Sequence, residues 1–103
     1  MDGINGQTFN TWPISISRSP VTGYFWVSGY GSTNAVDAFT SSGTFQPPQL
    51  GGCSTGSCSS SSAAGAFNSA AGVAVDKSGN VWVADLFNDR IEEFNGSSGA
   101  ARM

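Results

Sequence analysis

The stretch GVAVDKSGNVWVAD, residues Gly72 to Asp85, decides the fold because it has the pattern of one tight β-hairpin. Valines occur at positions 73, 75, 81 and 83, and this spacing places β-branched side chains on one face of each strand. Between the two runs, Gly79 and Asn80 tolerate a positive φ and favour a turn. The valines and glycines disfavour a helix. We therefore expect strands at 72–76 and 80–84, followed by a third at 90–94.

The same pattern occurs earlier in the chain. Trp26-Val27 corresponds to Trp82-Val83, and the segment VDAF at 36–39 corresponds to IEEF at 91–94. Matching the two copies predicts further strands at 13–17, 24–28 and 35–39, and a short glycine-led strand after each meander. Because Trp26 and Trp82 occupy equivalent positions, we expect both to pack between neighbouring sheets.

Composition restricts the possible partners. Charged residues make up 11% of the 103-residue chain, hydrophobic residues make up 39%, and the net charge is −3. Four basic residues cannot form a track for phosphates, so we expect no nucleic-acid partner. No apolar run approaches the roughly 20 residues of a membrane span. The first residues, MDGINGQTFN, do not resemble a signal peptide.

Residues 65–96 resemble the NHL repeat. The resemblance rests on GAFNSAAGVAVD at 65–76, GNVWVAD at 79–85, NDRI at 88–91 and Phe94. Residues 9–46 match the pattern more loosely. Alanine at position 70 replaces the proline usual in the family, and aspartate at 89 replaces the usual histidine. Ser17 and Gly29 stand where the first copy would have its two aspartates.

The resemblance implies an all-β fold in which each repeat is one four-stranded antiparallel blade of a β-propeller. Propellers have typically 4–8 blades, and this family's are often six-bladed, whereas the chain accounts for about two. Three arrangements remain open. We favour a piece of a longer propeller; the alternatives are a ring completed by several copies and a small two-sheet sandwich. On the first reading, we expect an N-terminal blade at 1–46, a loop at 47–64 and a C-terminal NHL-type blade at 65–103.

The segment between the copies is rich in serine and glycine, and we interpret it as a long exposed loop starting at Gln46. It contains Cys53 and Cys58. In an oxidising compartment these residues would form a disulfide, which is the favoured interpretation; a pair of free thiols is the alternative. Two cysteines without a histidine do not complete a zinc site, so we expect no metal and no cofactor.

The chain also lacks the residues of common catalytic sites. It has no histidine, which excludes Ser-His-Asp and Cys-His arrangements. Asp85 and Asp89 flank one turn and are a possible acid–base pair, but Asp76 and Asp85 at strand ends more simply accept backbone N–H bonds. We expect Arg90 to pair with Asp85. We interpret Glu92 and Glu93 as solvated positions on opposite faces of an outer strand.

These observations favour a non-catalytic binding or scaffold module that recognises a protein or a glycan. The alternative is a piece of a lactonase- or lyase-like propeller enzyme whose catalytic residues lie mostly outside the chain. Loops on rigid supports carry recognition, so the candidate ligand-binding residues lie in the second turns: Tyr30, Asn34, Phe87, Asn88 and Asp89. The resemblance and the cysteine pair imply an extracytoplasmic location, and the unpaired blade faces imply self-association.

Overall fold

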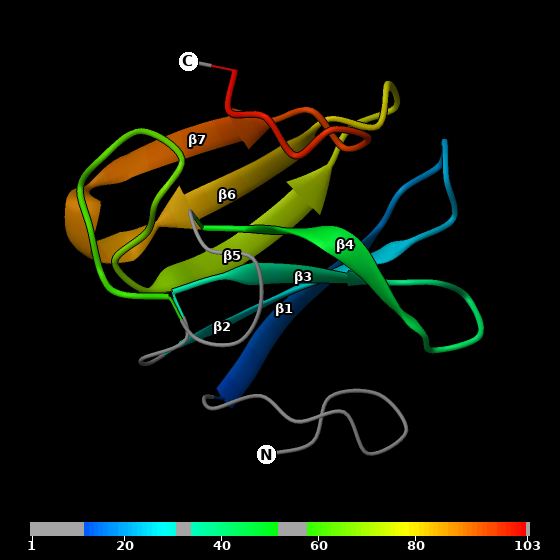
Figure 1. Ribbon diagram of the computed structural model, residues 1–103, viewed down its shortest axis with the longest axis horizontal. Helices are drawn as coiled ribbons and strands as arrows, with labels where there is room; N and C mark the ends of the chain where they lie inside the picture. Colours follow the sequence, from blue (N-terminus) through cyan, green and yellow to red (C-terminus); the bar gives the residue numbers. More distant parts are fainter. Residues whose placement is uncertain (1–11, 31–33, 52–57, 103) are drawn as a thin grey trace.

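The computed structural model describes residues 12–30, 34–51 and 58–102. Within these ranges, seven strands form two antiparallel sheets (Figure 1). The first sheet has the order β1-β2-β3-β4. Its strands are β1 (Trp12–Arg18), β2 (Phe25–Tyr30), β3 (Val36–Phe39) and β4 (Phe45–Leu50).

The second sheet has the order β5-β6-β7. Its elements are β5 (Ala70–Val75), β6 (Val81–Asp85), the short 3-10 helix η1 (Leu86–Asn88) and β7 (Arg90–Phe94). Ala101 forms a bridge with Phe94, so the chain after β7 returns along its free edge. The all-β fold predicted from the sequence is confirmed, and the strands start and end close to the expected positions.

The two sheets share one register. Trp26 lies opposite Ser17 and Ala38, and Trp82 lies opposite Ala74 and Glu93. The first strand of each sheet also has a register shift at the same place. It lies between Pro13 and Ser15 in β1 and between Ala70 and Gly72 in β5. The repeat inferred from the sequence is therefore a structural repeat, and each sheet is one propeller-type blade.

The core lies between the sheets, and the two blades contribute opposite faces to it. From the first sheet come Trp26, Val36, Ala38 and Leu50; from the second come Val73, Val81, Val83 and Phe94. Phe67, before β5, is fully buried and packs edge-on against Phe94 with ring centroids 5.5 Å apart. The tryptophan face of the first blade thus covers the valine face of the second, as in neighbouring blades of a propeller.

Serine hydroxyls of the first sheet seal the edge of β5. An edge strand leaves one row of N–H and C=O groups without ladder partners. The Ser15 hydroxyl accepts from the Val73 N–H at 3.2 Å and donates to the Val73 carbonyl at 3.3 Å, while the Val75 N–H donates to Ser17 Oγ at 3.0 Å. Ser28 Oγ donates to the Ala71 carbonyl at 3.3 Å. The blades are therefore joined by hydrogen bonds as well as by apolar packing.

The far end of the hairpin is also packed across the sheets. Gly79, in the turn between β5 and β6, has a φ of +87°, and a Cβ there would lie 3.1 Å from a methyl of Val21. A Cβ on Gly96 would collide with the Gly79 carbonyl. The turns at 19–22, 77–79 and 95–98 therefore need small residues where they meet.

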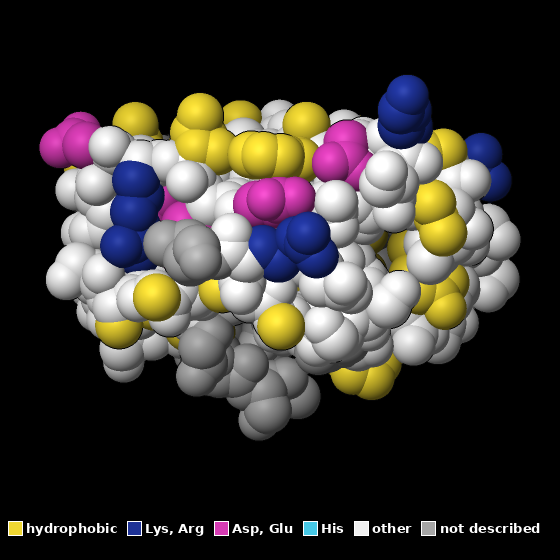
Figure 2. All heavy atoms as spheres, turned by 90° about the horizontal axis from the view of Figure 1, so that it is seen from above, with side chains coloured by type: hydrophobic (Ala, Val, Ile, Leu, Met, Phe, Trp, Pro, Cys, Tyr) yellow, Lys and Arg dark blue, Asp and Glu magenta, His cyan; other side chains and the backbone are white. Residues whose placement is uncertain are grey.

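Trp82 does not pack as the sequence suggests. Its register matches that of Trp26, yet it is 41% exposed whereas Trp26 is 1% exposed. The reason is that no described part of the chain covers this face of the second sheet. Ile91 on the same face is 68% exposed, and hydrophobic side chains form a row along one margin of the molecule in Figure 2.

The expected exposed loop from Gln46 is wrong at its start. Phe45–Leu50 forms β4 and pairs with β3, and Leu50 is buried in the core. Two prolines and two glutamines give this segment no clear alternation, but β4 is an edge strand of its sheet and tolerates proline there. The first sheet consequently ends at residue 50, beyond the predicted boundary at 46. Among the described residues, no helix is long and apolar enough to span a membrane.

Candidate functional site

The connection between β6 and β7 is a rigid turn. The N–H groups of Leu86 and Phe87 donate to the carbonyls of Ser69 and Asn68, each at 3.0 Å. Asp89 ends η1 in the left-handed conformation with a φ of 53°. The segment before β5 therefore holds the backbone of the turn in place.

Asp85 organises this turn from inside the protein. It is 1% exposed, and its Oδ1 accepts the Asn68 N–H at 2.7 Å. Its Oδ2 accepts from Asn88 Nδ2 at 2.8 Å and from Arg90 Nε at 3.0 Å. The ion pair expected between Asp85 and Arg90 is thus present. Asp85 therefore serves the fold, with each carboxylate oxygen engaged.

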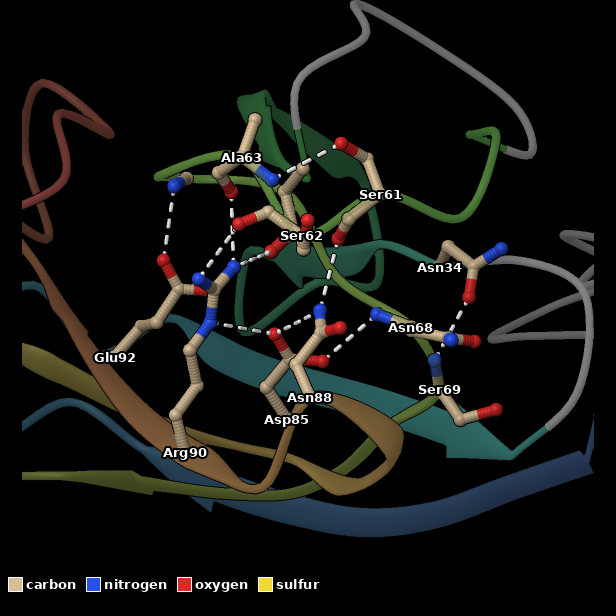
Figure 3. A network of polar contacts seen from close by, with 12 residues as sticks. Asn34, Ser61, Ser62, Ala63, Asn68, Ser69, Asp85, Asn88, Arg90 and Glu92 are labelled. Carbon is tan, nitrogen blue, oxygen red and sulfur yellow. Dashed lines mark hydrogen bonds and ion pairs between the residues drawn. The ribbon is translucent and has the colours of Figure 1, made fainter.

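Arg90 also ties down the segment that precedes β5 (Figure 3). Its Nη1 donates to the Ser62 carbonyl at 2.8 Å, and its Nη2 donates to the carbonyls of Ala63 and Ala66 at 2.8 and 3.0 Å. Asn88 Nδ2 adds a bond to the Ser61 carbonyl at 2.8 Å. Residues 61–63, which we expected to lie in a free loop, are consequently held against β7.

Glu92 was expected to be solvated, and this is wrong: it is 0% exposed. It faces the core side because it lies opposite Val83, which also points inward. Its Oε1 accepts the Gly65 N–H at 2.8 Å, and its Oε2 lies 3.2 Å from Arg90 Nη2 without an aligned hydrogen bond. Desolvation raises the pKa of Glu92; the Gly65 hydrogen bond and the Arg90 charge oppose this rise, and Asp85 adds to it.

Two of the candidate ligand-binding residues are accessible on this turn. Phe87 is 54% exposed, and Asp89 is exposed beside it. Leu86, which the sequence reasoning did not select, is 44% exposed. We call Leu86, Phe87 and Asp89 the turn surface. Asn88 is different: its amide nitrogen is committed to Asp85 and Ser61, so it positions the turn.

Asn34 has a structural role that differs from the expected exposed contact. It is 6% exposed and has a φ of 50°. Its Nδ2 donates to the Cys58 carbonyl at 3.0 Å, and its Oδ1 accepts the Ser69 N–H at 2.8 Å. Asn34 therefore joins three distant segments. The backbone of Tyr30 pairs with Trp12, but the Tyr30 side chain lies outside what the structure describes.

Cys58 is buried and disulfide-bonded. Cys53, the other half of the predicted pair, lies outside the described residues, so the pairing of these two cysteines stays a prediction. The burial of Cys58 beside Asn34 differs from the exposed loop that the serine-rich composition suggested.

Asp76 stabilises the hairpin turn. Its Oδ1 accepts the N–H groups of Ser78 and Asn80 at 2.9 and 3.0 Å, and its Oδ2 accepts the indole N–H of Trp82 at 3.0 Å. The Trp82 hydrogen bond is the main cause that lowers the pKa of Asp76. Within the described ranges, no group of three or more histidine, cysteine, aspartate or glutamate side chains is placed to hold a metal ion.

The hairpin and the turn that follows it lie within a segment that matches a known family model. Residues 67–91 match the family model of the NHL repeat. The match begins at the buried Phe67 and extends through β5, β6 and η1 into β7. The NHL repeat thus includes the turn surface and the residues that hold it. No curated protein matches the chain.

Sequence reasoning did not identify the residues that contact the turn between β6 and β7 and the start of β7. Asn68 and Gly65 act through their backbone N–H groups, which carry no side-chain signal. Glu92 was missed because two adjacent glutamates suggest solvent. The signal available in the sequence was the alternation of the strand: with Val81 and Val83 facing the core, a residue paired opposite Val83 must face it as well.

Proposed function

We propose that the chain is a non-catalytic, propeller-type binding module that recognises a protein or glycan partner through the turn surface. The observation that carries this proposal is the exposure of Leu86 and Phe87, at 44% and 54%, on a turn fixed by hydrogen bonds on both sides.

The turn surface has the features of a pre-organised contact. An aromatic and an aliphatic residue on a backbone that is already fixed lose little backbone freedom on binding, which favours affinity. Aromatic residues are also enriched among the positions that dominate interface energies. Asp89 places a carboxylate next to them and adds specificity for a partner with a donor or a cation.

The contacts of the charged residues support a role without catalysis. Asp85 and Arg90 are occupied by each other and by backbone groups. Glu92 lies within the protein against Arg90 and Gly65. Calorimetric titration with calcium and with zinc tests this part: we expect no heat of binding. Saturable binding of either ion would favour the propeller-enzyme alternative.

Substitution of the turn surface tests recognition. We would screen the immobilised chain against a displayed peptide library and a glycan array, and then measure the retained partners with Phe87→Ser, Leu86→Ser and Ile91→Ser. We expect the first two variants to lose roughly tenfold or more in affinity. Ile91→Ser removes a side chain that is more exposed than either, at 68%, from the sheet face and should bind normally. Equal affinity of Phe87→Ser and wild type contradicts the proposal.

We also propose that further blades complete a ring around this pair. The uncovered face with Trp82 and Ile91, 41% and 68% exposed, supports this arrangement. Exposed apolar faces of this kind favour association. Sedimentation at rising concentration should show self-association of the chain, whereas a compact monomer at every concentration would favour a self-contained two-sheet unit.

A further inference from the structure

A pocket lies between the two sheets, at the end opposite the turn surface. Its volume is about 160 Å³. It is bounded by the turn between β1 and β2, by the start of β4 and by the turn that follows β7. The lining residues that matter here are Thr22, Tyr24, Trp26, Gln46, Pro47 and Ser97. The pocket therefore belongs to both blades and depends on their packing.

The pocket contains uncommitted hydrogen-bonding groups on a buried aromatic floor. Trp26 is 1% exposed, and within the described residues its indole N–H has no hydrogen-bond acceptor. The Tyr24 and Ser97 hydroxyls make no side-chain hydrogen bond to a described residue either, and Thr22 Oγ1 only accepts the Tyr24 N–H, at 3.2 Å. These groups leave several donors and acceptors for an occupant.

Size and charge restrict the occupant. A cavity of about 150 Å³ accommodates one six-membered ring, whereas drug-sized ligands occupy about 300 Å³ or more. None of the described residues that line the pocket is charged, so it offers no partner for a phosphate, a carboxylate or a metal ion. Trp26, Tyr24 and Pro47 supply apolar surface beside the hydroxyl and amide groups. This combination suits a ring that has C–H faces and a hydroxylated edge.

We propose that this pocket binds one neutral pyranose unit of a saccharide. The ring lies against the aromatic side chains, and its hydroxyl groups accept from the Trp26 indole and bond to Tyr24 and Ser97. This site is separate from the turn surface, so it stands or falls independently of the function proposed there. It gives the two-blade unit a small-molecule subsite that neither sheet forms alone.

Chemical-shift titration of the ¹⁵N-labelled chain tests the proposal. D-glucose, D-galactose and N-acetyl-D-glucosamine are the probes, with benzoate as a charged ring of similar size. We expect at least one sugar to shift the Trp26 indole signal in a saturable way. Trp12→Phe and Trp82→Phe identify the other two indole signals, and Trp82→Phe should leave the affinity unchanged. Benzoate should produce no saturable shift.

Two conservative variants assign the contacts. Tyr24→Phe and Ser97→Ala each remove one hydroxyl and keep the packing, so each should weaken sugar binding roughly three- to tenfold. Their unfolding midpoints in urea should remain at the wild-type value, which separates lost binding from lost folding. Absence of a saturable shift with all three sugars overturns the proposal and leaves water as the occupant. Equal binding of benzoate, or wild-type affinity in both variants, overturns it as well.

Discussion

The two blades have the same register and differ in what their equivalent residues do. On the first sheet, Ser15, Ser17 and Ser28 bond to the β5 backbone. The register places Gly72, Ala74 and Ala84 at these positions on the second sheet. The tryptophan face of the second blade thus has the shape of the internal interface without its hydroxyls. A common strand pattern fixes the blade, and the side chains at three positions decide how it meets its neighbour.

The ends of the blades differ as well. Asp85 and Arg90 fix the turn of the second sheet, and continuing the register puts Gly29 and Ala35 at the corresponding places of the first. There, Asn34 performs the joining role through Cys58 and Ser69. The second blade therefore has a charged clamp where the first has an amide bridge.

Replacing the two equivalent tryptophans, Trp26 and Trp82, should give the largest contrast. Trp26→Ala creates a cavity between the sheets and should cost about 3–5 kcal/mol of unfolding free energy. Trp82→Ala acts at an exposed position and should cost about 1 kcal/mol or less, mainly through the Asp76 hydrogen bond. Urea denaturation measures both. Equal losses would mean that the two faces are buried alike.

Substitution in the charged clamp of Asp85 and Arg90 should have the next largest effect on stability. Arg90→Lys keeps the charge but loses the planar fork that reaches Asp85 and the backbone carbonyls, so it should cost about 2–3 kcal/mol. Arg102→Lys is the matched control, because Arg102 forms an exposed pair with Glu93 at 3.4 Å. It should change stability by less than about 0.5 kcal/mol. A small effect of Arg90→Lys in the same urea assay would show that the clamp is not needed.

The serine edge contacts should have a smaller effect. Ser17→Ala leaves the Val75 N–H without its acceptor and should cost about 1 kcal/mol. Ala74→Ser adds a hydroxyl at the equivalent, exposed position of the second sheet and should change stability by less than about 0.5 kcal/mol. If both substitutions are neutral by urea denaturation, the hydroxyls do not distinguish the blades.

The smallest expected effect is the pH dependence of stability that comes from one buried carboxyl group in each blade. Asp37 and Glu92 occupy equivalent positions, opposite Val27 and Val83. Desolvation raises the pKa of Asp37, and a hydrogen bond from Gln49 opposes the rise. A raised pKa in the folded state means that the fold retains the proton, so this contribution to stability falls as pH rises from the usual carboxyl range to the raised pKa.

Asp37→Asn should remove that loss and raise stability at neutral pH by up to about 1 kcal/mol, with a flatter pH profile. Asp89→Asn, at an exposed turn position, is the control and should leave the profile unchanged. Thermal unfolding between acid and neutral pH is the measurement. A wild-type profile that rises with pH in that window, and is unaffected by Asp37→Asn, contradicts the assignment.

The sequence predicted the strands because the valine and tryptophan alternation is local and strong, and the repeat reinforced it. It also predicted the Asp85–Arg90 pair, whose partners flank one short turn. The burial of Leu50, Asn34 and Cys58 could not be predicted from the sequence, because these residues are covered by segments distant in the chain. Composition alone made the segment after Gln46 seem solvated, although sheet pairing and Arg90 hold parts of it.

The pocket was also beyond sequence reasoning. Trp26 and Ser97 come together only when one blade packs on the other, and no spacing along the chain indicates that meeting. The turn surface could be located because loops between strands are identifiable from sequence. Which of its side chains are accessible could not be predicted, because that depends on which side chains form hydrogen bonds within the fold.

Amide hydrogen exchange at Val73 and Val75 tests the packing of the two blades most directly. Both N–H groups lie on the outer edge of β5 and donate to hydroxyls of the other sheet, at 3.2 and 3.0 Å. We predict slow exchange of both in the wild type, and faster exchange of Val75 alone in Ser17→Ala. Exchange of both amides at the rate of exposed groups in the wild type would contradict the account, because the edge of β5 would then be open to water.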